Sequence, residues 1–316
     1  MRFQLTEEQR ELRAAVRGVI GRRASAGSLW LVAPRGGAAD SYSPAPPRGA
    51  AQRGASRPAT VDSGPSLDRV LWRALGELGF FSLRLPEADG GAGLGLPEAV
   101  LVFEEAGWAL VPGPLVATHL AAGEVPGADT GETVVAAADG RLVEWLDEAD
   151  VVRPGAEGAV PLKSVDPLTP LHRVPAPAPT DPVAVLLTAA EQLGTATRVC
   201  ELAVQHARTR EQFGQPIGAF QAVKHLCAQM LVRAEVARAA VYAAAVTADR
   251  SDIAAARLLA DEAAVRGARD CLQVHGGMGF TWESEVHLHL KRAWVRAQRG
   301  GAITESEELL ADDLVA

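Results

Sequence analysis

The sequence predicts a mainly α-helical protein with a short β region in its middle and a four-helix bundle towards its C-terminus. Two observations favour this fold class. Apolar residues recur at helical spacing in four stretches after the proline-rich connector Pro175–Pro182, and strand-like segments are few and short. A chain of 316 residues with 48% hydrophobic content can bury a sizeable core. We expect an N-terminal helix at 1–21, a disordered insert at 22–65, an N-terminal helical domain at 66–123, a reduced β region at 124–174, the bundle at 175–300 and an acidic tail at 301–316.

Charge and cysteine content exclude several classes of protein. A net charge of −8 argues against a general surface for nucleic acid or anionic lipid, because both need a basic face. No apolar run approaches the roughly 20 residues that span a bilayer, and the N-terminus is too charged for a signal peptide. Cys200, Cys227 and Cys271 lie far apart in helical patterns, so we expect buried free thiols and a cytoplasmic protein.

The first two segments differ sharply in composition. Thr6 and Gln9 form a capping-box pattern ahead of apolar residues at helical spacing, which predicts an amphipathic helix over residues 6–21. We expect it to be a solvated terminal helix without a function of its own. Residues 22–65 are rich in Gly, Pro, Ala, Ser and Arg and cannot bury enough apolar area to offset their conformational entropy, so we expect disorder there.

Three helices are predicted in the N-terminal helical domain. Ser66 is expected to cap the first, and a glycine-rich loop, Leu85–Gly95, separates it from the second. A nucleotide-binding loop would need a strand before its glycines, and none is predicted, so a structural turn is favoured. The predicted helices are Leu67–Leu78, Leu96–Leu110 and Pro114–Ala121.

The remaining elements are predicted from the periodicity of apolar residues and from turn-forming residue pairs. Short strands are separated by the turn pairs Asp139-Gly140 and Pro154-Gly155. The helices of the bundle are long and alanine-rich, which allows close packing, and Ser251 is the expected N-cap of the third. The tail after Thr304 is expected to be frayed. The strands are Thr133–Ala138, Arg141–Leu146 and Val151–Val165, and the helices are Val183–Arg208, Gly218–Ala248, Ile253–Val274 and Ser284 to about Gln298.

Two motifs carry the chemistry. The turn after the first bundle helix holds Arg210, Gln212 and Phe213, which offer a guanidinium fork, an amide donor and a flat apolar face to a phosphate and its base. At the end of the third bundle helix, Gln273 precedes Gly276 and Gly277, where absent side chains let a dinucleotide approach the backbone. Taken singly, each motif is as well explained by a solvated helix end or a helix stop.

The runs Arg210–Gly214, Phe220–His225 and Gln273–Thr281 resemble the acyl-CoA dehydrogenases. The resemblance is strong from Asp181 to Val295, fair from Leu67 to Ala121, where Pro86–Gly91 resembles a loop of the family's N-terminal domain, and faint at the N-terminus. It implies an acyl-CoA dehydrogenase-like fold, FAD as cofactor and α,β-dehydrogenation of an acyl-CoA thioester. It also implies that the two motifs hold the ADP half of a flavin whose ring belongs to the neighbouring subunit.

The chain departs from that family at three places. The middle β region is about half the expected length and lacks the Thr-Glu-Pro-type segment that lies along the flavin ring. By ungapped comparison, the family's two positions for a catalytic base fall on Ala184 and Gly300, neither of which accepts a proton. Residues 22–65 replace ordered helical sequence, which a lineage-specific insertion and a reading-frame error would both explain.

Other titratable residues could replace the missing base or bind a metal. Glu191 lies about two turns beyond Ala184 and is a weak candidate for the base, although a carboxylate on the bundle surface or between subunits is favoured. Glu283 and Glu285 fit dipole-favoured acids at the start of the fourth helix. A metal site is discarded: His287 and His289 fall on different helix faces, and neither His275 nor any other residue completes a ligand set.

The chain therefore resembles the short, base-lacking subunit of actinobacterial heterotetrameric acyl-CoA dehydrogenases of the steroid-catabolism type. That resemblance implies an α2β2 assembly in which a partner supplies the base, together with an acyl-CoA substrate, an electron-transfer acceptor, and no nucleic-acid or membrane partner. No catalytic residue is assigned to this chain. Two alternatives stay open: a self-sufficient homo-oligomeric enzyme with a displaced base, and a non-catalytic scaffold subunit. The expected cofactor-binding residues are Arg210, Gln212, Phe213, Gln273, Gly276 and Gly277.

Overall fold

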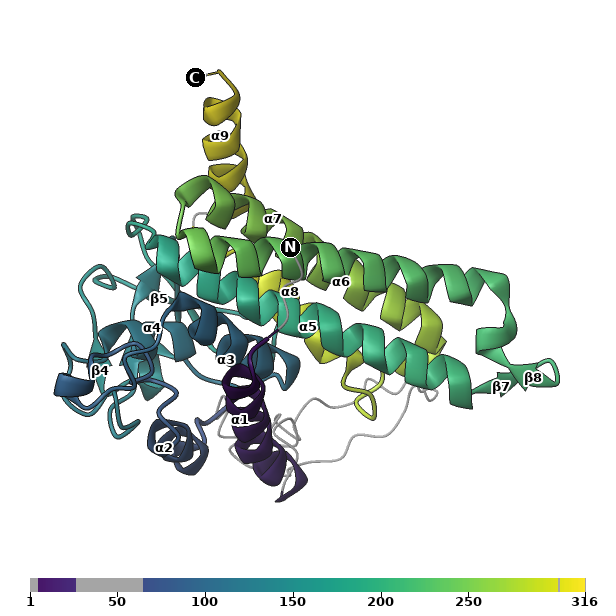
Figure 1. Ribbon diagram of the computed structural model, residues 1–316, viewed down its shortest axis with the longest axis horizontal. Coiled ribbons are helices and arrows are strands. Elements are labelled where there is room, and N and C mark those ends of the chain that lie inside the picture. The colour runs from purple at the N-terminus through teal and green to yellow at the C-terminus, as the bar shows by residue number, and fades with distance from the viewer. Residues whose placement is uncertain (1–4, 27–64, 301, 316) are drawn as a thin grey trace, which may run out of the picture.

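A computed structural model describes residues 5–26, 65–300 and 302–315 of the chain, so most of the predicted insert lies outside the described residues. Three long helices run side by side along the long axis of the molecule, and a fourth, shorter helix packs against the third (Figure 1). Buried alanines recur along α5, α6 and α7 and let these helices approach closely. These helices are α5 (Pro182–Thr209), α6 (Gln221–Thr247), α7 (Arg250–His275) and α8 (Val286–Arg296).

Two helices begin at a different cap from the predicted one. The carboxylate of Asp249 accepts hydrogen bonds from the backbone N–H groups of Ser251 and Asp252 at 2.9 and 3.2 Å, so Asp249 and not Ser251 caps α7. Asp68, not Ser66, caps α2 in the same way. In both places a charged carboxylate stands close to the expected cap, and it satisfies two amides while also opposing the positive end of the helix dipole.

The N-terminal helix is more than a solvated appendage, which corrects our expectation. The predicted capping box is confirmed, because Thr6 and Gln9 exchange hydrogen bonds of 3.1 and 3.2 Å. The helix extends past residue 21, buries Val16 and Ile20, and pairs Arg13 with Glu105 at 2.6 Å. It therefore anchors to α3. The helices of this region are α1 (Glu7–Ala26), α2 (Arg69–Glu77), α3 (Leu96–Trp108) and α4 (Leu115–Ala121).

Helices α3 and α5 cross in direct backbone contact at two glycines. A Cβ atom added to Gly194 would lie 1.9 Å from the carbonyl oxygen of Glu104, and one added to Gly107 would lie 2.0 Å from the carbonyl oxygen of Glu191. Neither position has room for a side chain. This crossing fixes the N-terminal helices against the bundle.

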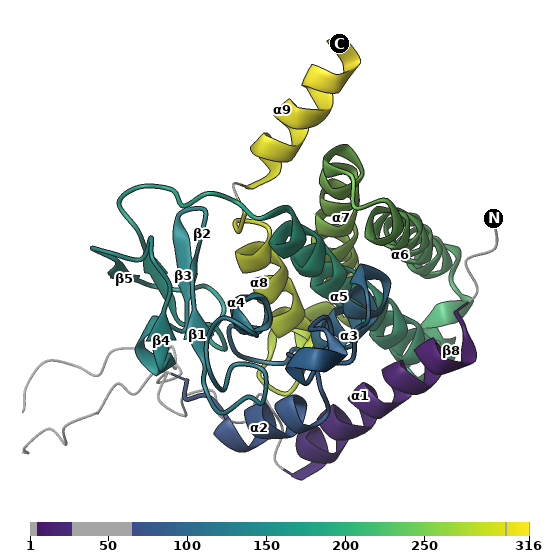
Figure 2. The same ribbon diagram turned by 60° about the vertical axis from the view of Figure 1, so that its left-hand side comes forward.

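The β region is small, as predicted, but contains one strand that the sequence did not reveal. That strand, β6 (Leu171–Arg173), lies between β3 and β5 in a four-stranded antiparallel sheet of order β2-β3-β6-β5. Strands β1 and β4 form a separate parallel pair. Figure 2 shows the sheet beside α8. The other strands are β1 (Val135–Ala136), β2 (Ala138–Asp139), β3 (Leu142–Glu144), β4 (Val151–Val152) and β5 (Val160–Leu162).

The C-terminal tail is helical, contrary to the expected fraying. Helix α9 (Ala302–Val315) packs against α7, and Ser251 Oγ donates a hydrogen bond to Asp313. The glycine-rich loop is a turn: a Cβ atom at Gly91 would lie 2.2 Å from the carbonyl oxygen of Leu85, so this position has no room for a side chain. Among the described residues, no helix is long and apolar enough to cross a membrane.

Candidate functional site

The first predicted motif forms a tight hairpin after α5. Strands β7 (Glu211–Gln212) and β8 (Gln215–Pro216) pair, and both residues of the turn between them, Phe213 and Gly214, have positive φ, at 55° and 78°. This is the pattern of a type I′ turn, in which glycine is comfortable and phenylalanine is strained. Phe213 is 89% exposed, and its ring makes an edge-on contact with Phe220, with centroids 6.0 Å apart.

The second motif ends α7. The backbone N–H of Gly276 donates to the carbonyl of Gln273, and Gly276 takes a positive φ of 61°. Apart from the adjoining backbone, no atom of the described residues lies within 4 Å of a Cβ atom built on Gly276 or Gly277. The side chain of Gln273 is exposed. The backbone here is therefore open to an approaching molecule.

The fold brings the two motifs to the same end of the bundle. Helix α6 follows α5 in the chain and runs in the opposite direction, and α7 then runs in the same direction as α5. The C-terminal ends of α5 and α7 therefore lie together (Figure 1). His206, one turn before Arg210, stacks on His275, the last residue of α7, with ring centroids 4.1 Å apart. Burial, helped by the neighbouring His275 and Arg210, lowers the pKa of His206. We call this region, Arg210–Gly214 with Gln273–Gly277, the open end.

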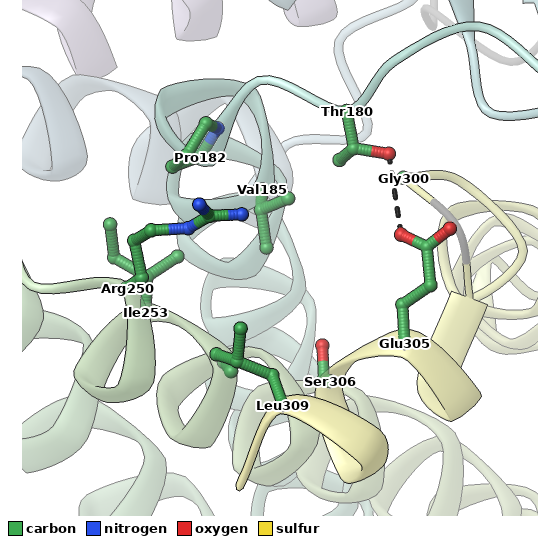
Figure 3. Close-up of a pocket in the computed structure, with 10 residues that line it drawn as sticks. Thr180, Pro182, Val185, Arg250, Ile253, Gly300, Glu305, Ser306 and Leu309 are labelled. Atoms are coloured by element: carbon green, nitrogen blue, oxygen red, sulfur yellow. Dashed lines mark hydrogen bonds between the residues drawn. The ribbon is translucent and has the colours of Figure 1, made fainter. Parts of the chain in front are cut away.

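Ala184 and Gly300, the two positions to which ungapped comparison assigned the base, lie near each other at the opposite end of α5. A Cβ atom on Gly300 would lie 3.4 Å from Cγ2 of Val185, the residue next to Ala184. Gly300 has a φ of 61°, so a replacement side chain would strain the backbone. Gly300 and Val185 line a small cavity of about 80 Å³, which has room for a few waters but not for an acyl chain (Figure 3).

One carboxylate that sequence reasoning did not consider faces this cavity. Glu305 lines it from the start of α9, with Oε2 3.5 Å from the hydroxyl oxygen of Thr180 (Figure 3). Its place beside Gly300 is a tertiary contact, which no local sequence pattern predicts. The cavity is thus lined by Gly300, which offers no proton acceptor, and by one acid, Glu305.

Comparisons with known proteins identify the family of the chain. Residues 184–310 match the family described as acyl-CoA dehydrogenase, C-terminal domain, and residues 48–130 match its N-terminal domain. The chain is 37% identical over 280 residues to acyl-CoA dehydrogenase IpdE2 of Mycobacterium tuberculosis, which covers 76% of this chain and 85% of that protein. The chain belongs to the acyl-CoA dehydrogenase family.

Solved structures extend the match to the whole fold. The ChsE4-ChsE5 complex from Mycobacterium tuberculosis superposes with a TM-score of 0.78 at 23% identity, covering 100% of this chain and 99% of that one. A variant named Tcur3481-Tcur3483 steroid ACAD gives 0.76 at 23% identity, with 98% of each chain covered. At such identities the likeness concerns the fold. The predicted mainly helical architecture with a reduced β region is confirmed.

The open end fits the ADP part of FAD, on which this family typically depends. Arg210, Gln212 and Gln273 are exposed and form no ion pair or side-chain hydrogen bond with other described residues, so their donors are available. The open backbone at Gly276 and Gly277 admits a phosphate, and the exposed face of Phe213 suits an adenine ring.

Glu191 is buried inside the molecule, which corrects the expected surface or inter-subunit position. Only 3% of it is exposed, and it pairs with Arg296 at 2.8 Å and with Arg299 at 3.6 Å. Arg296 thus engages Oε1 of the carboxylate, and Arg299 lies beside Oε2. A base in this position would have to break a buried ion pair before reaching any substrate.

The same cations tie the bundle to the sheet. Arg299 also pairs with Asp139 at 3.0 Å and with Glu144 at 3.4 Å. Burial opposes the charge of Arg299, but these carboxylates raise its pKa, whereas burial lowers the pKa of Arg296 to about 10 despite Glu191. Burial also raises the pKa of Glu144. We call these five residues, Asp139, Glu144, Glu191, Arg296 and Arg299, the closed end.

The other titratable candidates have structural surroundings. Glu285 pairs with Arg198 at 2.5 Å, and Glu283 is exposed. His287 packs against Trp282, burial lowers its pKa to about 4, and His289 is buried. Among the described residues, no three His, Cys, Asp or Glu side chains meet as a metal site. The cysteines are free thiols, of which Cys227 is only half-buried.

Proposed function

We propose that this chain is the base-lacking subunit of a hetero-oligomeric, FAD-dependent acyl-CoA dehydrogenase, which removes two hydrogens from the α and β carbons of an acyl-CoA thioester. This chain contributes the ADP-side contacts, and a partner subunit in an α2β2 assembly contributes the catalytic base. The observation that carries the proposal is the contrast between the open end and the region of Ala184 and Gly300 at the other end of α5. The cofactor motifs are present and unobstructed, whereas Ala184 and Gly300 offer no proton acceptor.

The roles of this chain's residues follow from their chemistry. Arg210 and Gln212 bind phosphate oxygens, Phe213 covers the adenine, and the backbone at Gly276 and Gly277 gives the dinucleotide close access. FAD, when bound, supplies the acceptor for the hydride that leaves the β carbon. The proton on the α carbon goes to a carboxylate of the partner, positioned within hydrogen-bond reach of it.

The names of the structurally similar proteins support two finer points. One is a complex of two differently named chains, and the other joins two names and acts as a steroid acyl-CoA dehydrogenase by its description. Both fit a chain that works with an unlike partner. A bulky polycyclic acyl-CoA is therefore the substrate class that we propose, and an electron-transfer protein is the proposed reoxidant.

Co-expression with a candidate partner, an acyl-CoA dehydrogenase-like chain that carries the catalytic carboxylate, tests the proposal. We expect native mass to give an α2β2 complex with about one flavin per heterodimer, measured by absorbance, while this chain alone retains little flavin and has no dehydrogenase activity. A yellow, active assembly of this chain alone would refute the shared site.

A scaffold subunit without a cofactor role makes a different prediction about Arg210. If Arg210 binds a phosphate, Arg210→Ala should lower the flavin affinity of the complex about tenfold or more, because a charge-assisted hydrogen bond is lost. Arg208→Ala is the matched control, since Arg208 is exposed, lies two residues earlier and has no ion pair with the described residues. Unchanged flavin content in both variants would favour the scaffold.

The position of Glu305 supports one second candidate, a self-sufficient homo-oligomer with a displaced base. Glu305 lines the cavity that holds Gly300, whereas Glu191 is committed to its ion pairs. Glu305→Gln and Glu191→Gln should each leave turnover of the complex within a few-fold if the partner supplies the base. A loss of orders of magnitude in Glu305→Gln, with Glu307→Gln on the same helix as control, would favour the displaced base.

A further inference from the structure

Two histidine rings stack at the open end, where α5 and α7 end side by side. The ring centroids of His206 and His275 lie 4.1 Å apart, and the ring planes are 22° from parallel. Both side chains are half-buried, and within the described part of the chain neither forms an ion pair. His206 lies one helical turn before Arg210, and His275 directly precedes Gly276. The rings therefore connect the two motifs of the open end, although neither ring has a role in the contacts proposed above.

A hydrogen bond fixes the position of the hydrogen on one of these rings. Nδ1 of His275 lies 2.8 Å from the carbonyl oxygen of Cys271. A carbonyl oxygen only accepts hydrogen bonds, so Nδ1 carries a hydrogen and the neutral ring keeps its lone pair at Nε2. Nε2 of His275 and both ring nitrogens of His206 have no hydrogen-bond partner among the residues that the structure describes. A ring nitrogen of this kind can bind a proton and then donate it in a hydrogen bond to an anion.

Opposing electrostatic effects decide whether the pair holds that proton. Burial lowers the pKa of His206, and so do the charges of His275 and Arg210. Two protonated rings at stacking distance would repel each other, so the pair binds one proton at most. The C-terminal ends of α5 and α7 act the other way, because their free carbonyl groups favour a cation. Phosphate oxygens bound to Arg210 would offset the guanidinium charge, and a bound anion would therefore favour the protonated pair.

Few other charged groups act on the pair. Asp270 on α7 is already paired with Arg233, and Glu285 is paired with Arg198. Burial raises the pKa of the Cys271 thiol, which keeps that neighbour uncharged. None of the remaining groups on the segments packed against these helix ends forms a hydrogen bond or ion pair with either ring in the described part of the chain. These groups are Arg208 on α5, Glu211 in β7, and Lys224, His225 and Cys227 on α6.

We propose that His206 and His275 form a proton-linked part of the phosphate site. The pair binds one proton from solvent when the diphosphate of FAD occupies the open end, and the new N–H donates to a phosphate oxygen. This inference rests on the proposed function, because it takes the open end as the ADP-side site. The pair is more basic with the anion bound than without it, so its contribution to affinity is complete at low pH and is lost as the pH rises.

Titration calorimetry of the co-expressed complex, stripped of flavin, measures this proton directly. FAD is added in buffers of different ionisation enthalpy, and the dependence of the heat on the buffer gives the number of protons taken up. FAD has no group that titrates near neutral pH, so these protons belong to the protein. At pH 6.5 we expect about half a proton per FAD, and a Kd that falls about threefold between pH 7.5 and pH 6.5. Zero uptake by the wild type would overturn the proposal without any variant.

Variants assign the proton to the pair. The double variant His206→Phe/His275→Phe keeps two stacked flat rings without a titratable nitrogen, and it should lose both the uptake and the pH dependence of Kd. His206→Phe alone leaves the hydrogen bond of His275 to Cys271 in place and should reduce the uptake. His225→Gln is the matched control, because His225 is exposed on the neighbouring helix outside the stack, and it should keep the uptake. Uptake that survives in the double variant, or that disappears in His225→Gln, would overturn the assignment.

Arg210→Gln separates this inference from the proposed function. It should weaken FAD binding about tenfold or more even if the histidines take up no proton, because a charge-assisted contact is lost. Weaker binding in Arg210→Gln without proton uptake by the wild type would overturn the role of the histidines and leave the open-end assignment intact. Absent FAD binding by the complex, or binding that Arg210→Gln does not change, would overturn both.

Discussion

Arginines lie at both ends of helix α5, but their surroundings differ. At the open end, Arg210 extends into solvent without an acidic partner among the described residues. At the closed end, Arg296 and Arg299 are at most 7% exposed, and carboxylates from α5 and the sheet surround them. Free donors suit the capture of an external anion, whereas paired ones hold two structural layers together.

The contrast extends to the glycines. Gly194 in α5 is pressed against the backbone of α3, so its missing side chain serves packing. Gly277 has nothing within 4 Å, so its missing side chain serves no contact within the described part of the chain. The absence of a side chain therefore permits close packing at Gly194 and leaves the backbone accessible at Gly277. Only the open one is suited to ligand access.

Breaking the closed end should have the largest effect. Arg296→Met leaves Glu191 buried with one distant cation, and we expect a loss of about 3–5 kcal/mol in the free energy of unfolding. Arg266→Met is the control, because Arg266 pairs with Glu262 on an exposed face and such pairs contribute about 0–1 kcal/mol. Urea denaturation measures both. A double variant that also carries Glu191→Met should recover much of the loss, since it removes both buried charges.

The glycine pair gives the next largest difference. Gly194→Ala should lower the unfolding free energy by about 1–3 kcal/mol or prevent folding, because α3 and α5 would have to separate. Gly277→Ala should stay within about 0.5 kcal/mol of the wild type, but lower the flavin content of the co-expressed complex if a dinucleotide contacts this backbone. Equal stability losses in the two variants would contradict the distinction between packed and open glycines.

Acid should weaken the packed N-terminal region through His119. Burial lowers the pKa of His119 to about 4, and its Nδ1 lies 3.2 Å from the carbonyl oxygen of Phe80. A folded pKa below the unfolded value of about 6.5 means that this stability is complete above pH 6.5 and is lost as the pH falls towards 4. The loss should reach about 2 kcal/mol at pH 5. In His119→Asn, the fall in unfolding free energy between pH 7 and pH 5 should shrink by that amount; an unchanged pH dependence would exclude His119 as its source.

Most of the helical architecture could be predicted from the sequence because long amphipathic helices carry their signal locally. Strand β6 could not, because Leu171–Arg173 is only three residues long, is flanked by prolines and gains its stability from β3 and β5. The caps Asp68 and Asp249 stood close to the predicted residues, so the error was one of choice between neighbouring acceptors.

The same distinction between local signals and contacts of distant segments applies to the candidate site. Both motifs of the open end are contiguous in sequence, so their chemistry was legible, although their meeting through His206 and His275 was not. The closed end joins residues from α5, α8 and the sheet, and the burial of Glu191 follows from that packing alone. A partial signal was available: Arg292, Arg296 and Arg299 follow the i, i+4, i+7 spacing of one helix face and require acids opposite them. Nothing local points to Glu305, because its position at the cavity depends on how α9 packs.

The smallest expected effect on stability separates strain from function at the open end. Phe213 occupies a left-handed position that favours asparagine, and Asn-Gly is the preferred pair for this turn. Phe213→Asn should therefore raise the unfolding free energy by about 0.5 kcal/mol, after allowance for the lost contact with Phe220. If the exposed ring covers adenine, the same variant should retain less flavin in the co-expressed complex. Higher stability with weaker flavin binding would mean that the strained backbone at Phe213 is retained because its ring binds the cofactor. Higher stability with unchanged flavin content would remove Phe213 from the cofactor site and leave Arg210 and Gln212 to account for that motif.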